Sequence, residues 1–174
     1  MKIKPSLVIV LLIAISAICV SAQKTTKFSS TYTSLGGKAC KFYPGGDGQD
    51  GMSLCKGPGR YRVRIYSSAT MTHINAELKG TDDSFPLASV SLGFNESKSK
   101  VEWRLANGKP FAVIFRIPKY AEPADGEFGA SKVIGEELTV IGLKGYEDLH
   151  TSIDVKTPNA NVKAREVADA GHKK

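Results

Sequence analysis

The sequence predicts a mainly β domain: an antiparallel sandwich or barrel-like fold of about seven or eight strands that ends in a short C-terminal α-helix. Three observations support this fold class. Apolar and polar residues alternate with a period of two in the segments after Gly59, turn-forming residues such as Asn107-Gly108 separate these segments, and apolar residues recur at helical spacing after Pro158.

The first residues of the chain predict export. Lys2 and Lys4 precede an apolar stretch over residues 7–20, and small side chains follow at a cleavage site. This pattern is typical of a secretory signal peptide, which we expect over residues 1–22. Because the apolar stretch is shorter than the ~20 residues that cross a bilayer, we expect a periplasmic or secreted protein without a stable membrane span after cleavage. An uncleaved membrane anchor is the lesser alternative.

The exported chain is expected to form one domain. Residues 23–30 are polar and are predicted to be a flexible N-terminal segment, residues 31–171 a single β-rich domain and residues 172–174 a tail. The chain carries a net charge of +7, part of which leaves with the signal peptide. This surplus favours an anionic partner only weakly. We do not expect nucleic acid as a partner, because export separates the protein from most of it.

Two of the three cysteines are predicted to form a disulfide. Cys19 leaves with the signal peptide, and the bulky Ile18 before it disfavours its use as a lipid attachment site. Cys40 and Cys55 then remain in an oxidising compartment, where we expect them to pair. The enclosed loop is of a size for which a disulfide stabilises the fold by about 3 kcal/mol. C-x-x-C spacing and neighbouring histidines are absent from the sequence, so a structural role is favoured over a redox or metal-binding role.

Alternation predicts the strands. They are expected over residues 60–65, 70–78, 85–94, 101–105, 111–115, 137–143 and 149–155. The fourth and fifth of these should form a hairpin over the three-residue loop Ala106–Gly108, which pairs Trp103 with Phe111 and Val101 with Val113. A two-residue Asn-Gly turn would place the apolar residues on opposite faces, so the longer loop is favoured.

The only tryptophan is expected in the core. Trp103 shares a face with Val101 and Leu105, which favours burial over an exposed platform for stacking sugars. Glu102 and Arg104 should then lie on the outer side of the sheet as cross-strand charges.

The end of the chain predicts one helix. Small and apolar residues recur at helical spacing at Ala160, Ala164, Val167 and Ala168. Asn159 is the expected cap and Gly171 the expected stop, and the alanine-rich face should pack on the sheet.

Several short motifs also resemble those of a known family. They are Thr31-Tyr32-Thr33-Ser34-Leu35, Cys40-Lys41, Cys55 with Gly57-Pro58-Gly59, Glu102-Trp103-Arg104, Gly108-Lys109-Pro110-Phe111-Ala112, and Asn159-Ala160-Asn161 with Ala164-Arg165. Together they are similar to motifs in a family of small exported bacterial proteins of unknown function. The resemblance implies a bacterial periplasmic or secreted setting, and it implies no activity and no site residues.

Two features are candidates for binding. Arg60, Arg62 and Arg64 alternate along one predicted strand, which could bind a carboxylate- or phosphate-bearing surface. The competing interpretation is a solvated face on which these arginines meet acids of a neighbouring strand, such as Glu77. The second candidate is the glycine-rich loop, in which Gly45, Gly46 and Gly48 expose backbone amides that could hold an anion, although no helix follows as in a phosphate-binding loop.

Signals for catalysis are weak. The sequence contains no G-x-S-x-G or H-E-x-x-H motif, and Asp47 and Asp50 lack the ligand order of a calcium loop, so we predict no catalytic residue, metal or cofactor. The paired acids Asp82-Asp83 and Glu136-Glu137 are of a type that glycosidases use, but their separation cannot be read from the sequence.

The leading functional hypothesis is therefore a non-enzymatic interaction domain that presents a basic strand face or the glycine-rich loop to an anionic envelope component or another protein. The alternatives are a hydrolase acting on cell-envelope polymer and a structural envelope component.

Overall fold

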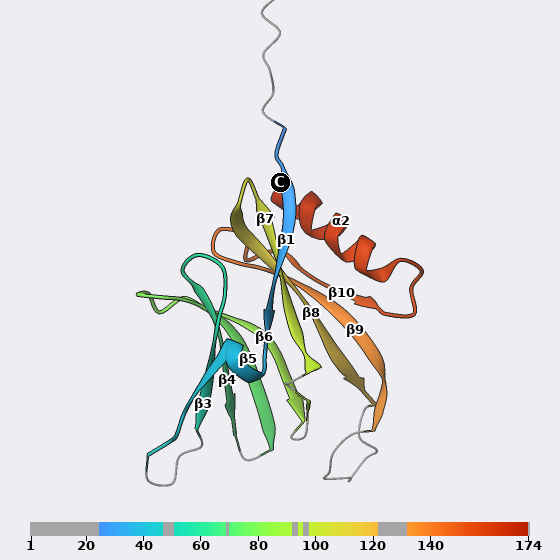
Figure 1. Ribbon diagram of the computed structural model, residues 1–174. Coiled ribbons are helices and arrows are strands. Elements are labelled where there is room, and N and C mark those ends of the chain that lie inside the picture. The colour runs from blue at the N-terminus through green and yellow to red at the C-terminus, as the bar shows by residue number, and fades with distance from the viewer. Residues whose placement is uncertain are drawn as a thin grey trace, which may run out of the picture.

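Two antiparallel sheets face each other in the protein (Figure 1). The computed structural model describes residues 25–46, 51–68, 70–91, 94–95, 98–121 and 132–173. Over these residues each sheet has five strands and a single α-helix follows the last strand. The mainly β prediction is confirmed, and the arrangement is an open sandwich rather than a closed barrel.

The order of the strands separates the chain into two sheets. Sheet A has the order β1, β7, β8, β9, β10, with bounds Phe28–Ser34, Lys100–Ala106, Lys109–Tyr120, Val133–Gly142 and His150–Asp154. Sheet B has the order β2, β3, β4, β5, β6, with bounds Cys40–Tyr43, Met52–Lys56, Tyr61–Ser67, Met71–Leu78 and Ser84–Ser91. A 3-10 helix, η1 (Gly37–Ala39), lies between β1 and β2, and the α-helix α2 spans Ala160–His172.

The described part of the chain forms ten strands, where about seven or eight were predicted. The strands that alternation did not predict are β1, β2 and β3. Strand β1 begins at Phe28, before the expected start at Thr31, and pairs with β7 along its whole length. Its Ser- and Thr-rich sequence has too few large apolar side chains to show a period of two, and β2 and β3 are short strands beside a glycine-rich loop. Pairing with neighbours, rather than local pattern, therefore defines these three strands.

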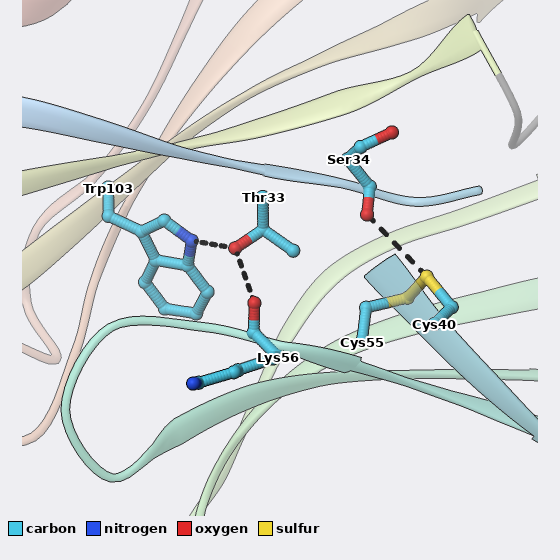
Figure 2. The surroundings of a disulfide bond; sticks show 6 residues. All are labelled: Thr33, Ser34, Cys40, Cys55, Lys56 and Trp103. Carbon is cyan, nitrogen blue, oxygen red and sulfur yellow. Dashed lines mark hydrogen bonds between the residues drawn. A yellow bond between two sulfur atoms is a disulfide. The ribbon is translucent and has the colours of Figure 1, made fainter. Parts of the chain in front are cut away.

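The core between the sheets is built around Trp103. This side chain is fully buried and its Nε1 donates a hydrogen bond of 2.9 Å to Thr33 Oγ1, which in turn donates one of 3.0 Å to the carbonyl oxygen of Lys56 (Figure 2). A Cβ atom on Gly57 would lie 2.8 Å from the indole ring, so the backbone approaches the ring more closely than a larger residue allows. The prediction of a core tryptophan is confirmed, and its one polar atom is satisfied.

The predicted hairpin register is wrong. Asn107 and Gly108 form a two-residue turn with φ values of 50° and 79°, the positive values that a type I′ turn requires. Trp103 pairs with Val113, and the register shifts before Leu105 pairs with Pro110. The extra residue in β8 is a β-bulge, which keeps the apolar residues on the core face after a two-residue turn.

A second core lies between sheet A and the helix. Ala160, Ala164 and Ala168 are buried and pack with residues of the outer side of β8 and β9, so the predicted alanine-rich face is confirmed (Figure 1). Asn159 occupies the N-cap position as expected, but with a φ of 58° and without a side-chain hydrogen bond to the helix. The helix also continues through Gly171, which approaches the side chain of Leu149 closely.

The predicted disulfide is present. Cys40 and Cys55 are directly opposite each other on β2 and β3, and their sulfur atoms are bonded at 1.97 Å (Figure 2). Cys55 is fully buried in the core between the sheets. The link fastens edge strand β2 to the rest of sheet B. No helix among the described residues is long and apolar enough to cross a membrane.

Candidate binding face

The outer side of sheet B carries three rows of side chains across its strands. Residues that pair in an antiparallel sheet point to the same side. The rows are Lys41, Leu54, Arg64, Asn75, Pro86; Lys56, Arg62, Glu77, Ser84; and Tyr43, Met52, Tyr66, His73, Ser89. We call this surface the basic face, because Lys41, Lys56, Arg62 and Arg64 belong to it and Glu77 is the only acid in the strands of sheet B.

Glu77 anchors both arginines of the face. Its side chain is 10% exposed. Arg62 Nε donates a hydrogen bond of 2.9 Å to Glu77 Oε2, and Arg62 Nη2 lies 2.9 Å from the same oxygen. The competing interpretation, in which the arginines meet Glu77 on the neighbouring strand, is confirmed for Arg62 and Arg64. One carboxylate cannot neutralise two guanidinium groups, so this part of the basic face keeps a positive charge.

Arg64 is held less completely than Arg62. Its Nε lies 2.8 Å from Glu77 Oε1, which is an ion-pair distance. The N–H is not directed along a hydrogen bond, and this Nε is a buried donor without a hydrogen-bond partner in the described part of the chain. The guanidinium carbon lies 5.2 Å from the centre of the Tyr66 ring, a cation–π contact.

Arg60 is separated from the other two arginines. It lies in the turn before β4, and its Nη2 donates a hydrogen bond of 2.6 Å to the carbonyl oxygen of Lys79. The predicted stripe of three arginines is therefore a pair on the basic face and a third residue in the turn beyond the end of the strand.

The glycine-rich loop and Arg64 line the same cleft. Its lining is formed by Tyr43, Pro44, Gly45, Gly46, Met52, Arg64 and Tyr66, and its volume is about 330 Å³. Two features that the sequence presented as separate candidates thus lie together, while Gly48 falls outside the described residues. We call this hollow the tyrosine cleft. It combines one cationic side chain with two aromatic rings.

Aromatic and cationic groups alternate along this edge of the face. The Lys41 ammonium lies 4.9 Å from the centre of the Tyr43 ring. Tyr66 also stacks on His73, with ring centres 5.0 Å apart, and His73 Nδ1 shares a hydrogen bond of 3.0 Å with Ser89. These contacts hold the rings beside the charges.

A second cluster of charges, which the sequence did not predict, lies beneath the helix. Glu102 and Arg104 were expected on a solvent-exposed side, and this prediction is wrong: they are 8% and 6% exposed under α2. Arg165 Nε donates a hydrogen bond of 2.6 Å to Glu102, and Arg104 binds Asp169 through Nε and Nη2 at 2.6–3.0 Å. We call these four residues the helix clamp.

Hydroxyl groups of β1 complete the helix clamp. Arg104 Nη1 donates to Ser30 Oγ at 2.7 Å, and Ser30 Oγ donates to Glu102. Burial opposes ionisation of Glu102, but hydrogen bonds from Arg165 and Ser30 outweigh it and lower the pKa of Glu102. The spacing of Arg165 and Asp169, one turn apart on the buried side of a helix, was the signal in the sequence. Because every member is paired within the protein, this cluster is structural.

The paired acids Asp82-Asp83 line a cleft between the β5–β6 turn and the connection from β9 to β10. Glu147 and His150 lie on the same cleft, which has a volume of about 660 Å³. A hydrogen bond from Lys144 lowers the pKa of Asp83, and backbone hydrogen bonds lower the pKa of Glu147. Glycoside hydrolysis needs one carboxylic acid with a raised pKa as the proton donor. Asp83 and Glu147 have the opposite shift, which disfavours this cleft as a hydrolase site.

Glu136 of the other predicted acidic pair forms an exposed ion pair with Arg116 at 3.0 Å. In the described part of the chain, no group of three or more His, Cys, Asp or Glu side chains is suited to hold a metal ion.

No protein-family model, curated protein or solved structure matches the chain. The resemblance to exported bacterial proteins therefore stays a prediction, and the functional argument depends on the chain's own residues. Of these, the basic face has the clearest chemical character: an excess of cations beside aromatic rings, on the side of sheet B that α2 does not cover (Figure 1).

Proposed function

We propose that the protein is an exported, non-enzymatic binding domain whose basic face binds an anionic polymer of the cell envelope. The single observation that carries the proposal is the charge imbalance of the basic face: within the strands of sheet B, Lys41, Lys56, Arg62 and Arg64 stand against Glu77 alone. Cations that outnumber acids on one surface attract polyanions and speed their association.

The opposite side of the molecule supports this choice of face. The helix α2 packs on the outer side of sheet A, where the four charges of the helix clamp neutralise one another. On sheet B, no described element lies over the outer side, and Lys41 and Lys56 are exposed. The surplus positive charge is therefore accessible to a large ligand.

The export setting agrees with this function. The N-terminal residues have the pattern of a secretory signal peptide, and a disulfide that joins β2 to β3 is suited to a periplasmic or extracellular compartment. Anionic polymers with carboxylate or phosphate groups would be the available partners there.

The test compares two pairs of charge reversals. Lys41→Glu with Lys56→Glu reverses the two exposed lysines of the basic face and leaves the arginines on Glu77. The matched control, Lys109→Glu with Lys156→Glu, makes the same change in net charge at exposed positions outside sheet B. Arginine reversals are avoided, because they would place new acids beside the buried Glu77.

Binding to a polyanion column and to soluble polyanion is measured from low to physiological salt. We expect the face variant to bind at least about tenfold more weakly than the parent, with a shallower salt dependence. The affinity of the control should stay within about twofold of the parent. Equal losses in both variants, or no binding by the parent protein, would contradict the proposal.

A further inference from the structure

We propose that the tyrosine cleft is a subsite for one uronic acid residue of an acidic polysaccharide, with Arg64 binding the sugar carboxylate. This inference rests on the proposed function and goes further, because it names the ligand and one residue that selects it.

Arg64 has hydrogen-bond donors that no described residue accepts from. Arg62 donates a hydrogen bond to Glu77 through Nε and forms an ion pair with it through Nη2. Arg64 lies at an ion-pair distance from Glu77, but its Nε makes no hydrogen bond. Among the described residues, neither Nη atom of Arg64 donates a hydrogen bond to the protein, and the side chain is 38% exposed. A guanidinium group with two unused donors on one edge is suited to a planar carboxylate, which it can bind through two parallel hydrogen bonds.

The walls of the tyrosine cleft beside Arg64 are largely apolar and aromatic. Tyr43, Tyr66, Met52 and Pro44 give the cleft apolar surface beside Arg64. A phosphate group or a flexible polyphosphate chain gains little from such walls, since its surface is polar oxygen. A pyranose ring with a carboxylate has one anionic edge and apolar C–H faces, so it can bind the guanidinium and pack on an aromatic ring at the same time.

The size of the tyrosine cleft and the access to it also bear on the ligand. A volume of about 330 Å³ lies at the lower end of the ~300–1,000 Å³ range of small-molecule sites, which is suited to a single ring and not to a whole oligosaccharide. Among the described residues, no atom lies within 4 Å of the position where a Cβ of Gly46 would lie, so the described rim of the cleft is open beside this residue. Lys41, in the same cross-strand row as Arg64, would meet the next carboxylate of the chain.

The test uses a substitution that keeps the charge. Arg64→Lys preserves the cation but removes the planar pair of donors. Arg62→Lys is the matched control, because Arg62 lies on the same strand and contacts the same Glu77, but does not line the cleft. Folding of each variant is verified by its thermal unfolding midpoint.

Each protein is titrated with three probes at one fixed ionic strength: an oligouronate, the same oligosaccharide with its carboxyl groups reduced to alcohols, and a polyphosphate of equal charge. We expect the parent to bind the oligouronate about tenfold more tightly than polyphosphate, with much weaker binding of the reduced sugar. Arg64→Lys should bind the oligouronate about tenfold more weakly than the parent and polyphosphate within about twofold of the parent, so the preference is lost. Arg62→Lys should keep the preference.

The outcomes separate this inference from the proposed function. If the parent binds both polyanions equally, or if both lysine variants lose oligouronate to the same extent, the uronic acid subsite is refuted while binding of polyanions by the basic face stands. If Arg64→Lys weakens polyphosphate most, the cleft binds phosphate and the inference is likewise overturned. If the parent binds neither polyanion, both proposals fail.

Discussion

Removing Asp169 tests how much the helix clamp stabilises the protein. The Asp169→Ala variant deletes three hydrogen bonds from Arg104, whose guanidinium is left buried with Ser30 as its remaining partner. Breaking a buried ion pair by removing one partner costs ~3–5 kcal/mol of stability. Since the Asp169 side chain is 23% exposed, water can reach part of the site, and we expect a loss near the lower limit, about 3 kcal/mol.

Urea unfolding measures this loss directly. The midpoint should fall while the dependence of the unfolding free energy on urea stays unchanged. Glu136→Ala is the matched control, because it breaks an arginine–carboxylate pair whose side chains are 45% and 51% exposed. Exposed pairs contribute only about 0–1 kcal/mol, so the control should unfold almost as the parent does.

A double variant identifies the origin of the effect. If the loss arises from an unpaired buried charge, adding Arg104→Met to Asp169→Ala should restore part of the stability, since an apolar side chain needs no partner. The reasoning is refuted if Asp169→Ala costs no more than Glu136→Ala, or if the second substitution adds a further full loss.

Three more predictions concern the helix, the pH dependence and the disulfide. Ala164→Leu should destabilise the protein by ~1–3 kcal/mol in thermal unfolding because it forces α2 away from sheet A, whereas Val162→Leu, 48% exposed, should change little. Burial opposes ionisation of Glu102, yet hydrogen bonds hold its folded pKa below the ordinary 4.5. The contribution of Glu102 to stability is therefore complete above that value and is lost as the pH falls through the folded pKa. Glu102→Gln should flatten the fall in unfolding free energy below pH 4.5. An unchanged dependence of the unfolding free energy on pH would argue against this role of Glu102. Reducing the disulfide of the parent should cost about 3 kcal/mol in urea unfolding, and replacing Cys40 and Cys55 by serine should cost more, because a serine hydroxyl replaces the fully buried sulfur of Cys55.

Local patterns in the sequence predicted correctly those features of the fold that depend on a single segment. Trp103 alternates with polar neighbours, so its burial follows from the period of two. The alanine face of α2 follows from the helical period in the same way. The disulfide follows from the two cysteines that remain after the predicted signal peptide. These features need no knowledge of which segment lies beside which.

The hairpin shows where a local rule fails. Both a strict two-residue turn and a three-residue loop assume that every residue after the turn alternates. A bulge in β8 breaks this assumption, because Phe111 and Ala112 are both buried in the core beneath α2. The Asn107-Gly108 turn was recognisable from its sequence, but the bulge is determined by the second core, which forms only when the helix packs on sheet A.

The prediction that Glu102 and Arg104 are exposed was wrong for a related reason. Alternation assigns Glu102 and Arg104 correctly to the side opposite Trp103, and charged residues on an outer side are usually solvated. Here that side is covered by a helix that begins at Ala160 and brings Arg165 and Asp169 as partners. Polarity alone does not distinguish a solvated face from one covered by a later segment with opposite charges.

The same comparison explains why the two arginines of sheet B and the charges of sheet A have different roles. In the helix clamp, two acids face two bases between sheet A and α2, so these charges fasten the helix to the sheet and neutralise one another. On sheet B, a single buried carboxylate orients Arg62 and Arg64, and Lys41 and Lys56 remain exposed around them. Sheet B thus keeps a positive surplus on a side that no described element covers, and Arg64 is the point where this charge meets an aromatic cleft.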